Sequence, residues 1–196
     1  MESRHKRNKN VDQALAGKIK SLIANSPWGV SSAYQVTVET GRFVDNLAFY
    51  HEAYASDKWD DYWLLGSMQP EFQRDNDKWS QQMQIQFVEN ILCGCPTKIL
   101  LYTLKEDDFS QCFMLDGQQR SYSLVDWMNG KFKVFDCYFS EINHRAVMGH
   151  GRISIEIYNF KSHVEACEFY IKMNRGITHS DKDIERALNY IAMNAA

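Results

Sequence analysis

The stretch that decides the fold is Cys112-Phe-Met-Leu-Asp116-Gly117-Gln118-Gln119-Arg120. Its apolar half, Phe113 to Leu115, is typical of a buried strand, and five polar or glycyl residues follow it. Beyond them, three apolar residues recur at the spacing of one helix face: Leu124, Val125 and Met128. The sequence therefore predicts a strand, a glycine-bearing turn and a helix in direct succession.

A turn of this kind suits phosphate binding. Gly117 lacks a Cβ, so its backbone can adopt a positive φ and let an anion approach the amides. The helix start adds unpaired N–H groups and a positive dipole end. Arg120 can form two parallel hydrogen bonds to phosphate oxygens, and Gln118 and Gln119 are neutral donors. Asp116 can hold a metal-bound water or orient Arg120; alternatively, these two residues simply pair across a tight turn.

Further motifs accompany D-G-Q-Q-R along the chain. They are Pro70-Glu-Phe72-Gln73-Arg74 with Trp79, then Pro96, and finally Asn174-Arg175-Gly176 with Ser180. In this order and at these spacings, the motifs resemble the N-terminal domains of GmrSD-type modification-dependent restriction enzymes, within the ParB/sulfiredoxin-like superfamily. The similarity extends from about Met68 to Ala187. One departure is Ser121-Tyr122, which replaces the family's hydrophobic residue after D-G-Q-Q-R and leaves the nucleotide preference open.

The resemblance implies an α+β fold of ParB/sulfiredoxin-like type, with a mixed sheet and packed helices. It also implies a nucleoside triphosphate (NTP) as ligand, with or without hydrolysis, Mg²⁺ as cofactor, and a DNA-related sensing, restriction or anti-restriction role. Asp116 and Arg120 would be catalytic, and Asp116 would be the metal ligand. The expected nucleotide-binding residues are Gln73, Arg74, Gly117, Gln118, Gln119, Asn174 and Arg175. Without the resemblance, Arg74 is equally a salt-bridged surface arginine, and Asn174-Arg175 equally end a helix.

Two other functions stay open beside NTP binding. A stand-alone metal-dependent DNA nuclease usually needs two converging carboxylates, or a carboxylate and a histidine, and only Asp116 is clearly placed. A non-enzymatic decoy or inhibitor would keep the fold and bind a protein partner. The resemblance implies that full-length relatives often carry a second nuclease domain with a His-Asn-His-type metal site. No such motif is recognised in these residues, so we expect NTPase activity more than DNA cleavage. The P-loop motif G-x-x-x-x-G-K is also missing.

The composition is that of an ordinary globular protein, with 44% apolar and 24% charged residues. A formal net charge of −3 argues against bulk electrostatic binding of nucleic acid, so any DNA contact needs a local basic patch. The apolar runs are too short to span a bilayer and no signal peptide is recognised, so we expect a cytoplasmic protein without a membrane role. A protein partner or a homo-oligomer stays open. The five cysteines should be reduced and buried, because Cys93-Gly-Cys95 alone cannot complete a zinc site.

We expect a basic arm and an extension of unknown role over residues 1–66, and the D-G-Q-Q-R domain over residues 67–196. In the extension, Leu15, Ile19 and Leu22 have helical spacing, a strand alternates from Val30, and an aromatic-faced helix follows from Phe43. In the domain, strands are predicted over 99–104, 113–115, 132–139 and 152–157. Besides the helix after D-G-Q-Q-R, helices are predicted to begin after Asn76 or Asp77, after Ser162 and after Ser180.

Overall fold

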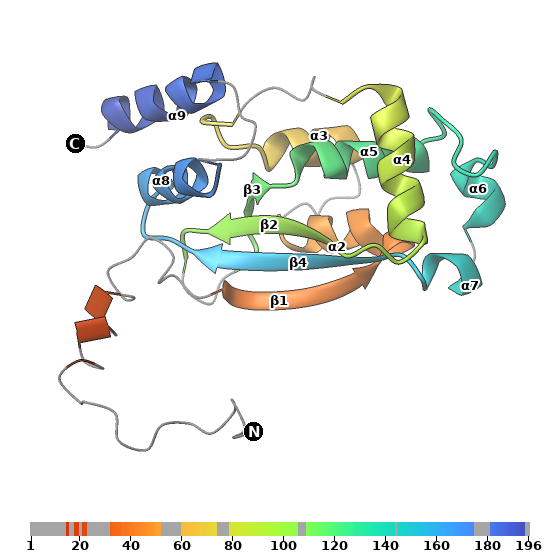
Figure 1. Cartoon of the computed structure of the whole chain (residues 1–196), viewed down its shortest axis with the longest axis horizontal. Coiled ribbons are helices and arrows are strands. Elements are labelled where there is room, and N and C mark those ends of the chain that lie inside the picture. Colours follow the sequence, from red (N-terminus) through yellow and green to blue (C-terminus); the bar gives the residue numbers. More distant parts are fainter. Residues whose placement is uncertain are drawn as a thin grey trace, which may run out of the picture.

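Four strands form a mixed sheet at the centre of the computed structural model (Figure 1). β1 (Ser32–Glu39) pairs antiparallel with β4 (Arg152–Asn159), and β4 pairs parallel with β2 (Thr97–Thr103). β2 pairs antiparallel with β3 (Phe113–Asp116), so the strand order is β1-β4-β2-β3. The α+β class predicted from the sequence is therefore confirmed.

The structure describes residues 32–51, 60–73, 79–105, 109–143, 145–174 and 181–194, together with a few residues near the N-terminus: Leu15, Lys18, Ile19, Ser21 and Leu22. Those few residues are helical, as their spacing predicts, and Leu15, Ile19 and Leu22 are exposed. Several residues singled out in the sequence lie outside the described residues: Arg74, Asn76, Asp77, Arg175, Gly176 and Ser180.

Helices pack on both faces of the sheet. The elements between β1 and β2 are η1 (Thr40–Arg42), α2 (Phe43–Phe49), α3 (Asp61–Ser67) and α4 (Gln81–Leu92). The elements after β3 are α5 (Gln118–Met128), α6 (Phe139–Ile142), α7 (Arg145–Met148), α8 (His163–Asn174) and α9 (Asp181–Asn194). Figure 1 shows α8 and α9 side by side, and these two helices pack against each other.

Alternation along β2 divides the apolar residues between two clusters. Ile99 and Leu101 belong to the cluster that α2, α3, α4 and α5 build on one face of the sheet. Leu100 and Tyr102 belong to the cluster on the other face, which α8, α9 and Phe72 complete. Because both faces of this strand are buried, its sequence is a nearly continuous apolar run.

Asp126 of α5 joins the helices that carry the site. Its carboxylate accepts hydrogen bonds from the Tyr62 hydroxyl of α3 at 2.8 Å and from Gln84 Nε2 of α4 at 3.1 Å. Lys131 Nζ lies 2.8 Å from the same carboxylate, and desolvation raises the pKa of Tyr62, with Asp126 adding to the rise. A half-buried ionic centre therefore fixes α3 and α4 against α5.

Three sequence predictions are wrong. The strand predicted over 132–139 is instead a tight turn, in which Phe135 and Asp136 take positive φ values of 51° and 60°. The helix predicted to begin after Asn76 or Asp77 begins at Gln81, where the Ser80 hydroxyl accepts a hydrogen bond from the Met83 N–H. The cysteines are not all buried, because the side chains of Cys93 and Cys95 are exposed.

The boundary expected between residues 66 and 67 falls inside α3 (Asp61–Ser67). β1 also lies in the same sheet as β3, and residues of α2 and α3 share one apolar cluster with Met114 and Leu124. Across the described ranges, no helix has the length and apolar character that crossing a bilayer requires.

Candidate functional site

The turn after β3 is built around Gly117. This residue is the N-cap of α5 with φ 108° and ψ 11°, a left-handed conformation that side chains disfavour. A Cβ added here would lie 2.5 Å from Ile99 Cδ1, so the turn packs directly on β2. The D-G-Q-Q-R sequence therefore forms the predicted strand, glycine turn and helix.

The start of α5 is not capped by a side chain. Its first intrahelical hydrogen bond runs from the Ser121 N–H to the Gly117 carbonyl, at 2.8 Å. The N–H groups of residues 118–120 come before this bond in the helix and have no intrahelical partner. Gly117, the N-cap, has no side chain that could accept a hydrogen bond from them. These groups and the helix dipole make this end of α5 favourable for an anion.

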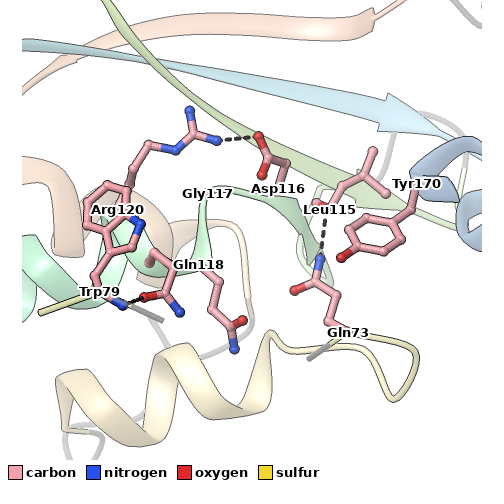
Figure 2. Close-up of a pocket in the computed structure, with 9 residues that line it drawn as sticks. Gln73, Trp79, Leu115, Asp116, Gly117, Gln118, Arg120 and Tyr170 are labelled. Carbon is pink, nitrogen blue, oxygen red and sulfur yellow. Dashed lines mark hydrogen bonds and ion pairs between the residues drawn. The ribbon is translucent and has the colours of Figure 1, made fainter. Parts of the chain in front are cut away.

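A pocket of about 340 Å³ lies at this helix start (Figure 2). Its lining residues come from β3, α5, α8 and the segment between α3 and α4, and they are Gln73, Trp79, Leu115, Asp116, Gly117, Gln118, Gln119, Arg120 and Tyr170. Five of the seven predicted nucleotide-binding residues and both predicted catalytic residues are described, and all of these except Asn174 line the pocket.

Gln118 and Gln119 are the distinctive part of the lining. They retain only 8% and 9% exposure, yet within the described part of the chain neither Nε2 atom has a hydrogen-bond partner. Gln119 Oε1 accepts a hydrogen bond from the Trp79 N–H at 3.1 Å, which orients its amide. A buried donor without a partner destabilises a protein by about 1–3 kcal/mol, so two of them in one pocket point to a ligand that accepts hydrogen bonds.

Asp116, the last residue of β3, and Arg120, in the first turn of α5, form an ion pair through Asp116 Oδ2 and Arg120 Nη2. Their side chains are 39% and 25% exposed, so the pair lies at the rim of the pocket and not in the core. The contact uses one carboxylate oxygen and one guanidinium nitrogen. Asp116 Oδ1 and the other donor groups of Arg120 can therefore meet a ligand.

Gln73 holds the edge of β3 from outside the sheet. Its side chain is buried, and its Nε2 donates to the carbonyls of Met114 and Leu115 at 2.6 and 2.8 Å. The Met114 N–H in turn donates to the Met68 carbonyl at 2.7 Å. These bonds satisfy the free edge of β3, so Gln73 positions the strand that leads into the Gly117 turn.

Asn174 does not line the pocket. It is buried at the end of α8, where its Nδ2 donates to the Tyr170 carbonyl at 2.7 Å, a bond within the helix. Tyr170, one turn earlier, does line the pocket, and its ring lies 5.7 Å from that of Phe72. The sequence does not predict Tyr170 at the site, because its place on an apolar helix face is typical of a core residue. The available signal was the nearby Asn174.

A metal at this pocket would depend on few protein ligands. Among the residues that the structure describes, no three His, Cys, Asp or Glu side chains gather in a group that could hold a metal ion. Asp116 is the one acidic residue among those that line the pocket.

Comparisons of the chain with protein-family models, with curated proteins and with solved structures gave no match.

Proposed function

We propose that this pocket binds a nucleoside triphosphate through its phosphate groups, together with Mg²⁺. The observation that carries the proposal is the pair of buried amide nitrogens, Gln118 Nε2 and Gln119 Nε2, which have no partner among the described residues and lie at the uncapped start of α5. Phosphate oxygens accept hydrogen bonds and carry the negative charge that a helix N-terminus favours. One ligand group thus satisfies both features.

Arg120 supplies the positive charge that the phosphates need. Its guanidinium lies at the rim, where it can turn from Asp116 toward a phosphate and form two parallel hydrogen bonds. Since a phosphate carries more negative charge than a carboxylate, the ligand competes well for this arginine. The ion pair then acts as a resting position for Arg120 when the pocket contains no nucleotide.

Asp116 fits Mg²⁺ as a single protein ligand. This ion keeps several water molecules and is often held by one or two carboxylates plus the phosphates of the substrate. Asp116 Oδ1 would contact the cation, and release of Arg120 to the phosphates would free Oδ2 as well. Bound Mg²⁺ would neutralise phosphate charge, while Asp116 would position a water molecule for slow hydrolysis.

Trp79 is the residue best placed to contact the base. Its ring packs edge-on against Phe87 at 5.2 Å, and the residue is half-buried at the pocket. Stacking on an aromatic ring is tolerant of base identity, so this contact would add affinity without selecting one nucleotide.

By its resemblance to GmrSD-type domains, the protein would couple nucleotide binding to a DNA-related sensing or restriction role.

The test is a thermal-shift series with the four ribonucleoside triphosphates, with and without Mg²⁺. A ligand present at 100 times its Kd stabilises the folded state by about 2.7 kcal/mol, which is about 5–10 °C in Tm for a chain of this size. Gln118→Met should abolish most of the shift and leave the unliganded protein equally or more stable, because it removes an unpaired buried donor.

Gln86→Met is the matched control, because Gln86 is exposed on α4. It should leave both the shift and the stability unchanged. If none of the four nucleotides shifts the Tm of the wild type, nucleotide binding is wrong, and a non-enzymatic partner-binding role becomes the better hypothesis. Incubation with supercoiled plasmid and Mg²⁺ tests the nuclease alternative, which requires nicking that disappears in Asp116→Ala.

A further inference from the structure

Cys93 and Cys95 lie on either side of a tight turn that ends α4. Gly94 between them has a φ of 90°, and the turn is fixed by hydrogen bonds from the Gly94 N–H to the Ile91 carbonyl at 2.8 Å and from the Cys95 N–H to the Asn90 carbonyl at 2.9 Å. This is the glycine-terminated end that many helices adopt. The turn therefore holds the backbone of the two cysteines on one short loop, with a single residue between them.

The spacing of the two residues suits a disulfide. Two residues along an extended chain are separated by at most about 7.2 Å, and a turn shortens that distance. Disulfides join Cα atoms roughly 4.4–6.8 Å apart. A Cβ added at Gly94 would meet no atom within 4 Å, so the loop has open space around it.

Exposure separates these two thiols from the other cysteines. Cysteine is among the residues most often buried, yet Cys93 and Cys95 are both exposed. Cys112 and Cys167 are buried in the two apolar clusters, and burial raises the pKa of the Cys167 thiol to about 12. Cys137 is half-buried. Only the exposed pair combines access to solvent with a second thiol two residues away.

We infer that Cys93 and Cys95 form a reactive dithiol that exchanges with low-molecular-weight disulfides such as glutathione disulfide. One thiolate attacks a sulfur of glutathione disulfide, forms a mixed disulfide and releases one glutathione. The second thiolate then attacks the protein sulfur of that mixed disulfide, forms the Cys93–Cys95 bond and releases the second glutathione. The protein loses two electrons and two protons, and the two released glutathione thiols carry them.

The reaction is independent of the nucleotide pocket, because neither cysteine lines it. Within the described ranges, the two thiols also belong to no group of three or more His, Cys, Asp or Glu side chains that could hold a metal, whereas a structural zinc site normally has four ligands. The feature that distinguishes a dithiol from two unrelated surface thiols is therefore the second step. A thiol without a neighbour stays attached to glutathione, whereas a paired thiol releases it.

The experiment treats the reduced full-length protein with excess glutathione disulfide, stops the reaction with acid, and maps Cys93 and Cys95 by peptide mass spectrometry. The wild type should contain a Cys93–Cys95 disulfide and little glutathione on either residue. Cys93→Ser and Cys95→Ser should each retain glutathione on the remaining cysteine, about tenfold more than the wild type retains at the same residue. Cys137→Ser is the matched control and should behave as the wild type at the pair.

Phenylarsine oxide provides a second measurement, because its arsenic condenses with two neighbouring thiols and releases water. The wild type and Cys137→Ser should bind it at this loop, and both single variants of the pair should lose that binding. Stable glutathione on Cys93 or Cys95 of the wild type, or equal arsenical binding by all four proteins, would overturn the inference.

Discussion

Gln73 Nε2 lies 2.8 Å from the carbonyl oxygen of Leu115, although the two residues are 42 positions apart in the sequence. Figure 2 shows this bond to the right of the Asp116–Arg120 pair. One buried amide thus connects the segment after α3 to the strand that leads into the Gly117 turn. The geometry of the pocket depends on that connection.

Gln73→Ala should destabilise the protein strongly. The substitution leaves the Met114 and Leu115 carbonyls without this buried donor, and each buried polar group left without a partner costs about 1–3 kcal/mol. We expect the free energy of unfolding to fall by about 2–4 kcal/mol in chemical denaturation. Gln86→Ala, at an exposed position of α4, should change it by less than about 0.5 kcal/mol. Equal losses in the two variants would show that Gln73 does not hold β3.

Arg120→Ala should reduce nucleotide affinity more than folding stability. Truncating one partner of a charge-assisted pair in a binding site costs about 2–4 kcal/mol of affinity. The Asp116–Arg120 pair is at the rim, and exposed ion pairs contribute about 0–1 kcal/mol to stability. Arg120→Lys should recover part of the affinity, because an ammonium group cannot form the two parallel bonds. Calorimetric titration and denaturation of the same variants measure both quantities, and a stability loss above about 3 kcal/mol would make the pair structural.

Gly117→Ala should separate steric from conformational strain. The new Cβ would collide with Ile99 Cδ1. The backbone would also keep a positive φ, which destabilises a non-glycine residue by about 1–3 kcal/mol. Ile99→Val removes the Cδ1 atom, so the double variant should regain the steric part of the loss and keep the conformational part. Measured by denaturation, strict additivity of the two substitutions would contradict this packing.

The local part of the site could be predicted from the sequence, because it depends on neighbours in the chain. The strand, the turn at Gly117 and the helix face of Leu124 and Val125 follow from residue types within one stretch. The wrong strand over 132–139 shows the limit of such patterns. Alternating apolar residues there lead into a turn closed by two reciprocal hydrogen bonds between Val134 and Cys137, at 2.9 and 3.0 Å.

The long-range part could not be predicted from residue types alone. The resemblance places Gln73 at the site, but its bonds to the Met114 and Leu115 carbonyls, and the position of Tyr170 at the pocket, depend on how distant elements pack. Exposure of Cys93 and Cys95 depends on where the turn after α4 points. Burial tendencies of residue types are averages, so they fail at single loop positions.

His163 should make stability depend on pH. Burial lowers its pKa below the ordinary value of 6.5, although nearby Glu71 opposes the shift, and its Nδ1 lies 2.8 Å from the Tyr102 hydroxyl. The folded protein therefore favours the neutral ring. The stability that comes from keeping His163 neutral is fully present above about pH 6.5. It is lost as the pH falls through the lowered pKa of His163 in the folded protein.

Denaturation midpoints at pH 7.5 and pH 5 check this dependence. His163→Gln should lose less stability between the two pH values than the wild type, because its side chain does not titrate. His150→Gln changes an exposed histidine and should keep the wild-type dependence. A wild-type dependence in both variants would assign the titration to other groups.

The pairing of β1 with β4 has a consequence for synthesis on the ribosome. Gln35 of β1 and Ser154 of β4 are hydrogen-bonded across 119 residues of chain. At roughly 5–20 residues per second, β1 leaves the ribosome roughly 6–24 seconds before its partner strand leaves it. During that interval its backbone donors and acceptors are open to other strands in the cell. Expression at high concentration should therefore favour aggregation of incomplete chains, and binding of a chaperone to the residues around β1 would protect them.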